Sequence, residues 1–98
     1  MNKKFGTKEL AKKIGIMTFG KAIEAQRLAE EMTLKEFASL LGISIASLAD
    51  LENGRRIPTP SRAVMIARKL REPEAYWVQL SIQDKLREED IHLKVTVI

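Results

Sequence analysis

The sequence TLKEFASLLGISIASLADLENGR, which occupies residues 33–55, predicts two short helices joined by a tight turn. Thr33 precedes a glutamate by three residues, which is the capping-box pattern that starts a helix. Gly42 is expected to end this helix, because glycine readily adopts the left-handed conformation that often follows a helix. Ser44 is then the expected N-cap of a second helix, and Asn53-Gly54 is expected to stop it.

The spacing of small and apolar residues in this stretch is typical of a helix-turn-helix. A small residue is needed where two such helices cross closely, and Ala38 occupies that place. Gly42 lies four residues later in the turn, and Leu48 and Leu51 can anchor the second helix on a core. Leu34–Leu51 is therefore predicted to form a helix-turn-helix, which places its second helix in the major groove of DNA. An ordinary helical hairpin is the alternative.

Three further helices are expected around this unit, which makes the predicted fold all-α with five helices. Thr18 is the expected N-cap of a helix that runs to about Met32. Pro60 fits the first turn of a fourth helix, where its missing N–H is harmless, and Pro73 opens a fifth that ends near Asp90. Apolar residues recur at helical spacing in each of these segments.

The chain divides into three predicted parts. Residues 1–17 are basic and are expected to form an N-terminal arm or a short helix. Residues 18–90 are expected to form the helix-turn-helix domain. Residues 91–98 are expected to form a C-terminal β-strand, because their pattern alternates and is rich in β-branched side chains.

The predicted C-terminal strand needs a partner, because an isolated strand is unstable. Pairing with the same strand of a second copy would build a symmetric homodimer, with Val95 and Val97 as dimerising residues. Addition to the sheet of another protein is one alternative, and a frayed tail is another.

Composition indicates one small globular domain. The 98 residues are 45% hydrophobic and 31% charged, which favours a folded chain over a disordered one. The absence of cysteine excludes disulfides and thiolate metal sites, and the single histidine, His92, excludes a multi-histidine site. No stretch approaches the ~18 apolar residues that cross a membrane, so a cytoplasmic protein is expected. No metal or cofactor is expected, nor is an enzyme, because no nucleophile–base pair or phosphate-binding glycine loop occurs.

Charge is distributed in alternating blocks along the chain. Residues 1–21 hold six lysines and one acid, and residues 55–71 hold six bases and no acid. The segments 22–54 and 72–98 are net acidic. Two basic blocks on an otherwise mildly acidic chain indicate a surface that faces a polyanion such as nucleic acid, although basic runs also occur as ordinary solvated faces.

The stretch around residues 33–55 resembles the Cro/cI-type helix-turn-helix family of phage repressors and bacterial regulators. The matching residues are Thr33-Leu-Lys-Glu-Phe-Ala38, Leu41-Gly-Ile-Ser44 and Leu48-Ala-Asp-Leu-Glu-Asn-Gly-Arg55. The resemblance covers about Phe19 to Leu70. It implies a five-helix, lambda-repressor-like DNA-binding domain whose helix Ser44–Asn53 enters the major groove.

The resemblance also implies roles for individual residues. Arg27 and Glu52 occupy the places of a structural ion pair, which a mostly buried carboxylate needs. Cations and an amide at matching places are suited to phosphate oxygens. The implied phosphate-contacting residues are Lys35, Asn53, Arg55, Arg56 and Arg62. The residues implied to face the bases are Ser44, Ile45, Ala46, Ser47 and Asp50.

The chain departs from the family at the starts of the two motif helices. Phage repressors often have glutamines there, which can bind adenine through two hydrogen bonds. This chain has Leu34, Ile45 and Ala46 instead. Asp50 can accept from cytosine, and Ile45 or Ala46 can touch thymine methyl groups. Direct readout is therefore expected to be sparse, which leaves apolar or water-mediated readout, shape readout and weak DNA binding as alternatives.

Two functions are compatible with this pattern. The first is a transcriptional repressor that binds double-stranded DNA as a homodimer, on a palindromic operator of its own gene. The second is an antitoxin that acts mainly by binding a small toxin protein. The segment Pro73-Glu-Ala-Tyr-Trp77, followed by Leu80 and Leu86, resembles the corresponding helix of HigA-type antitoxins, which repress their own operon as dimers and neutralise a ribonuclease toxin.

Overall fold

The computed structural model describes residues 16–97, and over that range it is all-α with five helices and no strand. This confirms the predicted helical class for the described residues. The arm or short helix expected at 1–17 lies outside them except for its last two residues. The helices are α2 (Phe19–Ala29), α3 (Leu34–Leu41), α4 (Ile45–Glu52), α5 (Pro60–Leu70) and α6 (Glu74–Glu88).

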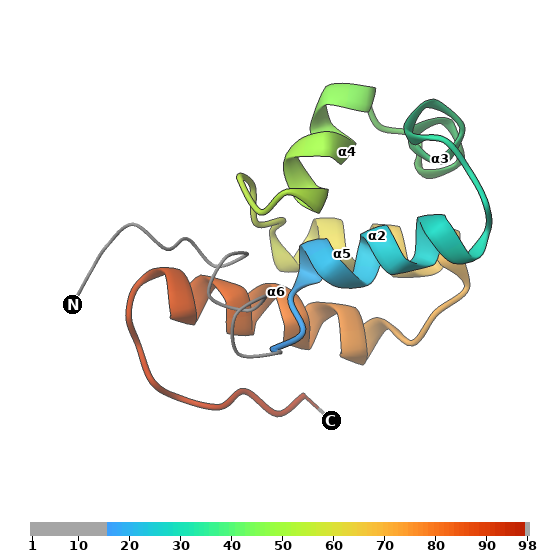
Figure 1. The fold of residues 1–98 in the computed structure, drawn as a ribbon. Helices are drawn as coiled ribbons and strands as arrows, with labels where there is room; N and C mark the ends of the chain where they lie inside the picture. The colour runs from blue at the N-terminus through green and yellow to red at the C-terminus, as the bar shows by residue number, and fades with distance from the viewer. Residues whose placement is uncertain (1–15, 98) are drawn as a thin grey trace.

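The helices form a small bundle in which α4 stands on one side and α6 on the other. In Figure 1, α3 and α4 lie above α2 and α5, and α6 lies below them. α4 packs on α2 and α3, while α6 packs on α5 and α2. The first helix of the described chain is thus in contact with both α4 and α6.

Side-chain caps start four of the helices, at Thr18, Thr33, Ser44 and Thr59. At Thr33 the capping box is complete, because the Glu36 N–H donates to the threonine hydroxyl and the Glu36 carboxylate accepts from the Thr33 N–H. These contacts use N–H groups that have no partner inside a helix.

Left-handed residues set several of the helix ends. Gly42 ends α3 with a φ of 72°, as expected from the sequence. α2 ends at Ala29, earlier than predicted, because Glu31 has a φ of 54° and the Met32 N–H donates to the Arg27 carbonyl. This reversal ends the helix roughly one turn before the predicted end near Met32.

The core lies where α2, α3, α4, α5 and α6 meet. Trp77 is fully buried and its ring meets that of Phe19 edge to face, with centroids 5.2 Å apart. Leu28, which the helical pattern places on the inner face of α2, is instead exposed. Leu28 lies nine residues after Phe19, which is about two and a half helical turns, so its side chain points away from the face that Phe19 buries. The largest fully buried hydrophobic side chains are Trp77, Phe19, Phe37, Ile23, Leu41, Leu48 and Ile66.

A buried carboxylate joins α6 to the start of α2. Asp84 accepts a 2.9 Å hydrogen bond from the Phe19 N–H and a 2.9 Å bond from the Arg87 guanidinium. Burial raises the pKa of the Asp84 carboxyl above its usual value, while these two donors act in the opposite direction. The contact satisfies an N-terminal N–H of α2 from a residue 65 positions away, so local sequence patterns gave no sign of it.

The prediction of a C-terminal strand at 91–98 is wrong for the single chain, since residues 91–97 form neither helix nor strand. A strand exists only when its backbone pairs with another, and no other described segment is a strand. The side chain of Gln83 contacts the segment instead, through the carbonyl of Leu93 and the N–H of Val95. Val95 and Val97 are partly buried there.

Gly20 permits α2 to approach the end of α4 closely. A Cβ atom added at Gly20 would overlap the carbonyl oxygen of Leu51 and lie 2.9 Å from that of Glu52. Both obstacles are backbone atoms of α4, so they cannot move aside as a flexible side chain could. The position of α4 on α2 therefore depends on the missing side chain.

We expect Gly20→Ala to lower the free energy of unfolding by about 2 kcal/mol, because overpacking outweighs the better helix propensity of alanine. Urea unfolding followed by circular dichroism measures this. Gly42→Asn is the control, because nothing lies within 4 Å of a Cβ there and asparagine tolerates a positive φ. A Gly20→Ala variant as stable as the parent protein would show that α2 and α4 are not in close backbone contact.

Candidate nucleic-acid interface

An ion pair between Arg27 and Glu52 fixes the end of α4 to α2. Arg27 Nε donates to one carboxylate oxygen of Glu52 over 2.7 Å, and Nη2 donates to the other over 3.1 Å. Arg27 Nη1 also donates to the Met32 carbonyl over 3.0 Å. One side chain therefore connects α2, the α2–α3 turn and α4.

This pair is largely removed from water, with the Arg27 and Glu52 side chains 15% and 7% exposed. Hydrogen bonding to Glu52 raises the pKa of Arg27, while burial acts in the opposite direction. Glu52 is the last residue of α4, where the helix dipole disfavours a negative charge. Glu52 therefore depends on Arg27 both for hydrogen bonds and for charge neutralisation.

The residues expected to face bases lie along α4 and differ in how accessible their side chains are to a DNA partner. Ile45 and Ala46 are exposed, with 47% of Ile45 accessible. Ser44 caps the helix through the Ser47 N–H and also donates to the Ser47 hydroxyl over 2.9 Å. The two serines thus use part of their hydrogen-bonding capacity on each other. What α4 presents most openly is a short aliphatic surface.

Asp50, the other polar residue in this set, is also engaged. Its carboxylate accepts from Arg55 Nε over 3.2 Å, a pair that the sequence analysis did not anticipate. The five-residue separation crosses the end of α4, which local helix spacing rules do not cover. Since Arg55 remains 72% exposed, the pair is weak and either side chain can turn to DNA.

Part of the expected phosphate-contacting set gathers where α4 meets α5. A cavity of about 380 Å³ is bordered by Ser47, Arg56 and Arg62, with Arg56 and Arg62 supplying its charge. Asn53 uses its side-chain oxygen to accept from the Arg55 N–H over 2.9 Å, which leaves its amide N–H groups to donate. The arrangement offers several cationic donors beside the exposed face of α4.

Lys35 lies apart from that group. It is exposed in the first turn of α3 and borders a different depression, whose other charged residues are Glu30, Glu31 and Glu36. The structure therefore brings Arg56 and Arg62 together and sets Lys35 among acids.

A helix-turn-helix family model matches residues 23–77, which is more than half of the chain. The chain belongs to the Cro/cI-type helix-turn-helix family. No curated protein and no solved structure matches it significantly. The match begins within α2 and extends into α6, so it includes Arg27, Glu52 and the α4–α5 cations. Proteins of this family bind DNA and regulate transcription, and the whole interface described above falls within the matched segment.

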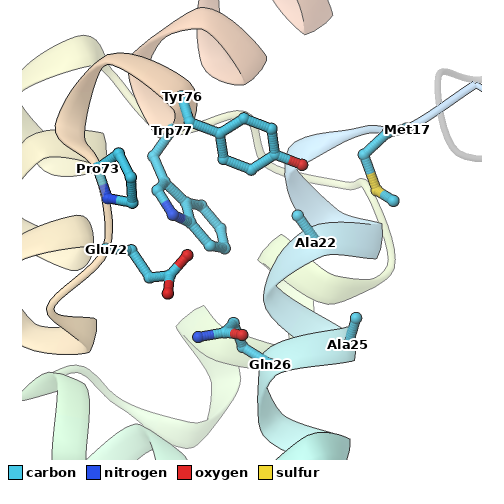
Figure 2. Close-up of a pocket in the computed structure, with 8 residues that line it drawn as sticks. All are labelled: Met17, Ala22, Ala25, Gln26, Glu72, Pro73, Tyr76 and Trp77. Atoms are coloured by element: carbon cyan, nitrogen blue, oxygen red, sulfur yellow. The ribbon is translucent and has the colours of Figure 1, made fainter.

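A second cavity of this helix-turn-helix protein, of about 460 Å³, lies between α2 and the start of α6. Figure 2 shows the rings of Tyr76 and Trp77 on one side of it and Ala22 and Ala25 of α2 on the other, with Met17 near its edge. Its remaining residues include Glu72 and Gln26 but no cation, which distinguishes it from the α4–α5 cavity. The cavity therefore offers no positive charge to attract a phosphate, and Glu72 adds a negative one.

Residues 16–97 contain neither a membrane-spanning helix nor a cluster of metal-binding side chains. No helix in that range is long and apolar enough to cross a membrane. Nor do three metal-binding side chains of the histidine or carboxylate type gather anywhere in that range.

Removing one partner of the buried Arg27–Glu52 pair should lower the stability of the fold. We expect Arg27→Met to lower the free energy of unfolding by about 3–5 kcal/mol, because it leaves Glu52 buried without a counter-charge. The double variant Arg27→Met/Glu52→Leu should be clearly more stable than this single variant. Arg68→Met is the matched control, because it breaks an exposed pair with Glu74 and should change stability by about 0–1 kcal/mol. Equal urea midpoints for Arg27→Met and Arg68→Met would contradict the interpretation.

Proposed function

We propose that the protein represses transcription by binding a palindromic operator as a homodimer, with α4 of each copy in the major groove, and that its own gene is among its targets. The observation that carries this is the exposed face of α4 beside the cationic donors Arg55, Arg56 and Arg62. A major groove admits one helix, and the flanking cations match the phosphates that line it.

Affinity in this proposal comes mainly from the phosphate backbone. Each neutralised phosphate releases counterions, so binding by Arg56 and Arg62 is strong at low salt and falls as salt rises. These contacts fix the position of α4 on the duplex but do not distinguish sequences.

Sequence preference then comes from few contacts. Ile45 and Ala46 are exposed and can touch thymine methyl groups, and Asp50 can accept from cytosine once it releases Arg55. Because α4 offers few polar side chains to the bases, the shape of the groove and bridging waters contribute more to sequence preference. Two copies acting on two half-sites about 34 Å apart would multiply a weak single-site preference.

A second candidate function is that of an antitoxin that binds a toxin protein. The observation that favours it is the apolar rim of the α2–α6 cavity, where Met17 and Tyr76 are 45% and 44% exposed. Large exposed hydrophobic side chains beside a hollow are common at protein interfaces. This surface is separate from α4, so both functions are compatible in one chain.

A mobility-shift assay with the DNA upstream of the protein's own gene tests the first proposal. The double variant Arg56→Ala/Arg62→Ala should weaken binding to any duplex and lower the slope of log affinity against log salt by about 2, close to one per lost phosphate contact. Arg68→Ala/Lys69→Ala removes the same charge from the last turn of α5 and is the matched control. It should leave the slope nearly unchanged.

Two outcomes would contradict the proposal. One is the absence of any shift at low salt, and the other is an equal loss in both double variants, which would indicate a response to net charge alone. A preference for the protein's own upstream DNA over a scrambled duplex is required for the autorepressor assignment.

A further inference from the structure

The chain reverses direction after α6 and returns beneath it (Figure 1). Asp90 produces the reversal with a φ of 61°, and the Ile91 N–H donates to the Leu86 carbonyl over 2.8 Å. The returning segment, residues 91–97, therefore passes within reach of Gln83 on α6.

Gln83 holds this segment along one backbone edge. Its Nε2 donates to the Leu93 carbonyl and its Oε1 accepts from the Val95 N–H, each over 2.8 Å. A side-chain amide that spans a carbonyl and the N–H two residues later imitates the N–H and carbonyl of a single residue in a neighbouring parallel strand. Gln83 thus prepares the segment for strand pairing at the positions of Leu93 and Val95.

The opposite edge of the same segment makes no hydrogen bond to the described residues. In an extended chain, neighbouring residues direct their N–H and carbonyl groups to opposite edges. Lys94 and Thr96 therefore direct theirs away from Gln83, and no hydrogen bond within residues 16–97 uses them. Unpaired strand edges of this kind are templates for pairing with another chain.

We propose that the Lys94–Thr96 edge pairs antiparallel with the same edge of a second copy, with Val95 of both copies on the two-fold axis. This contact deepens the proposed function, on which it rests for its role, because it names the surface that joins the two DNA-binding copies.

Charge and hydrophobic pattern select this register. Centring the pair on Lys94 would set two lysines directly opposite each other, which is unfavourable. Centring it on Val95 instead places Lys94 opposite Thr96 and Leu93 opposite Val97. All three cross-strand pairs on one face are then aliphatic, and the segment is complementary to itself. Self-complementarity is the requirement for a symmetric dimer, which favours a second copy over an unrelated sheet.

The surroundings of Leu93 add apolar surface to this contact. Leu93 is 65% exposed and borders a groove of about 710 Å³. Of the other hydrophobic side chains along this groove, Met17 and Ile91 are also exposed. In the proposed register Val97 of the second copy lies over Leu93 and covers part of this surface, which a two-stranded ribbon needs because it is marginal alone.

Single cysteines test the register directly, because the chain contains none of its own. At a non-hydrogen-bonded pair on the axis the two Cα atoms are about 4.5 Å apart, within the range of a disulfide. Val95→Cys should therefore form a disulfide-linked dimer under mild oxidation. Lys94→Cys and Thr96→Cys are matched controls whose like residues are diagonal neighbours about 7–8 Å apart, too far to bond without backbone movement.

The expected result on non-reducing gels is that most Val95→Cys protein becomes dimeric while both controls stay largely monomeric. Fastest cross-linking at Lys94→Cys would establish the other register and overturn the proposal. Similar cross-linking at all three positions, or at none, would also overturn it, since the first indicates random collision and the second indicates no pairing.

Gln83 provides an independent readout. Adding Gln83→Ala to the Val95→Cys chain should slow cross-linking several-fold, because the segment is no longer held by one edge. Adding Gln79→Ala instead should not, because Gln79 lies on the same helix and its side chain makes no hydrogen bond within the described residues. Cross-linking is measured without DNA, so its failure leaves DNA binding untouched, and a protein that cross-links as expected but never shifts DNA would refute only the proposed function.

Discussion

The ion pair between Arg27 and Glu52 determines where α4 stands, and the DNA-facing surface depends on that placement. The pair joins the last turn of α2 to the last residue of α4 with two hydrogen bonds. The missing side chain of Gly20 lets the same two helices approach at the backbone level. Attraction at one point and close backbone contact at another fix both the position and the rotation of α4. An eight-residue helix has little stability of its own, so α4 depends on these tertiary contacts to remain folded.

This rigid placement contrasts with the few hydrogen-bonding groups that α4 offers to DNA. Ser44 and Ser47 bond to each other and Asp50 bonds to Arg55, so the free surface of the helix is mainly aliphatic. The cations gather instead at the junction of α4 and α5. Affinity and discrimination therefore come from different parts of the interface. A weakly discriminating helix benefits most from symmetry, because two copies must satisfy two half-sites at once.

The helices could be predicted from the sequence because their signals are local. Thr33 with Glu36, Gly42, Ser44 and Pro60 each act within one turn, and the structure places helix boundaries at these residues. Contacts between distant residues could not be predicted in this way. Asp84 reaches the start of α2 from α6, Gly20 matters only because the α4 backbone lies against it, and Asp50 pairs with Arg55 across a helix end. The expected C-terminal strand failed in the single chain for a related reason, since alternation specifies a conformation but pairing requires another backbone. The Arg27–Glu52 contact was anticipated only through family resemblance, which carries information about distant residues that spacing does not.

The central claim is that α4 and the α4–α5 cations form the surface that meets DNA. Methyl and arginine side-chain NMR signals, followed during titration with a short duplex at low salt, test it most directly. The account predicts the largest shifts at Ile45, Ala46, Arg56 and Arg62, with little change at Ala22 and Ala25 beside the α2–α6 cavity. Shifts concentrated at that cavity, with the α4 methyl groups unmoved, would contradict it.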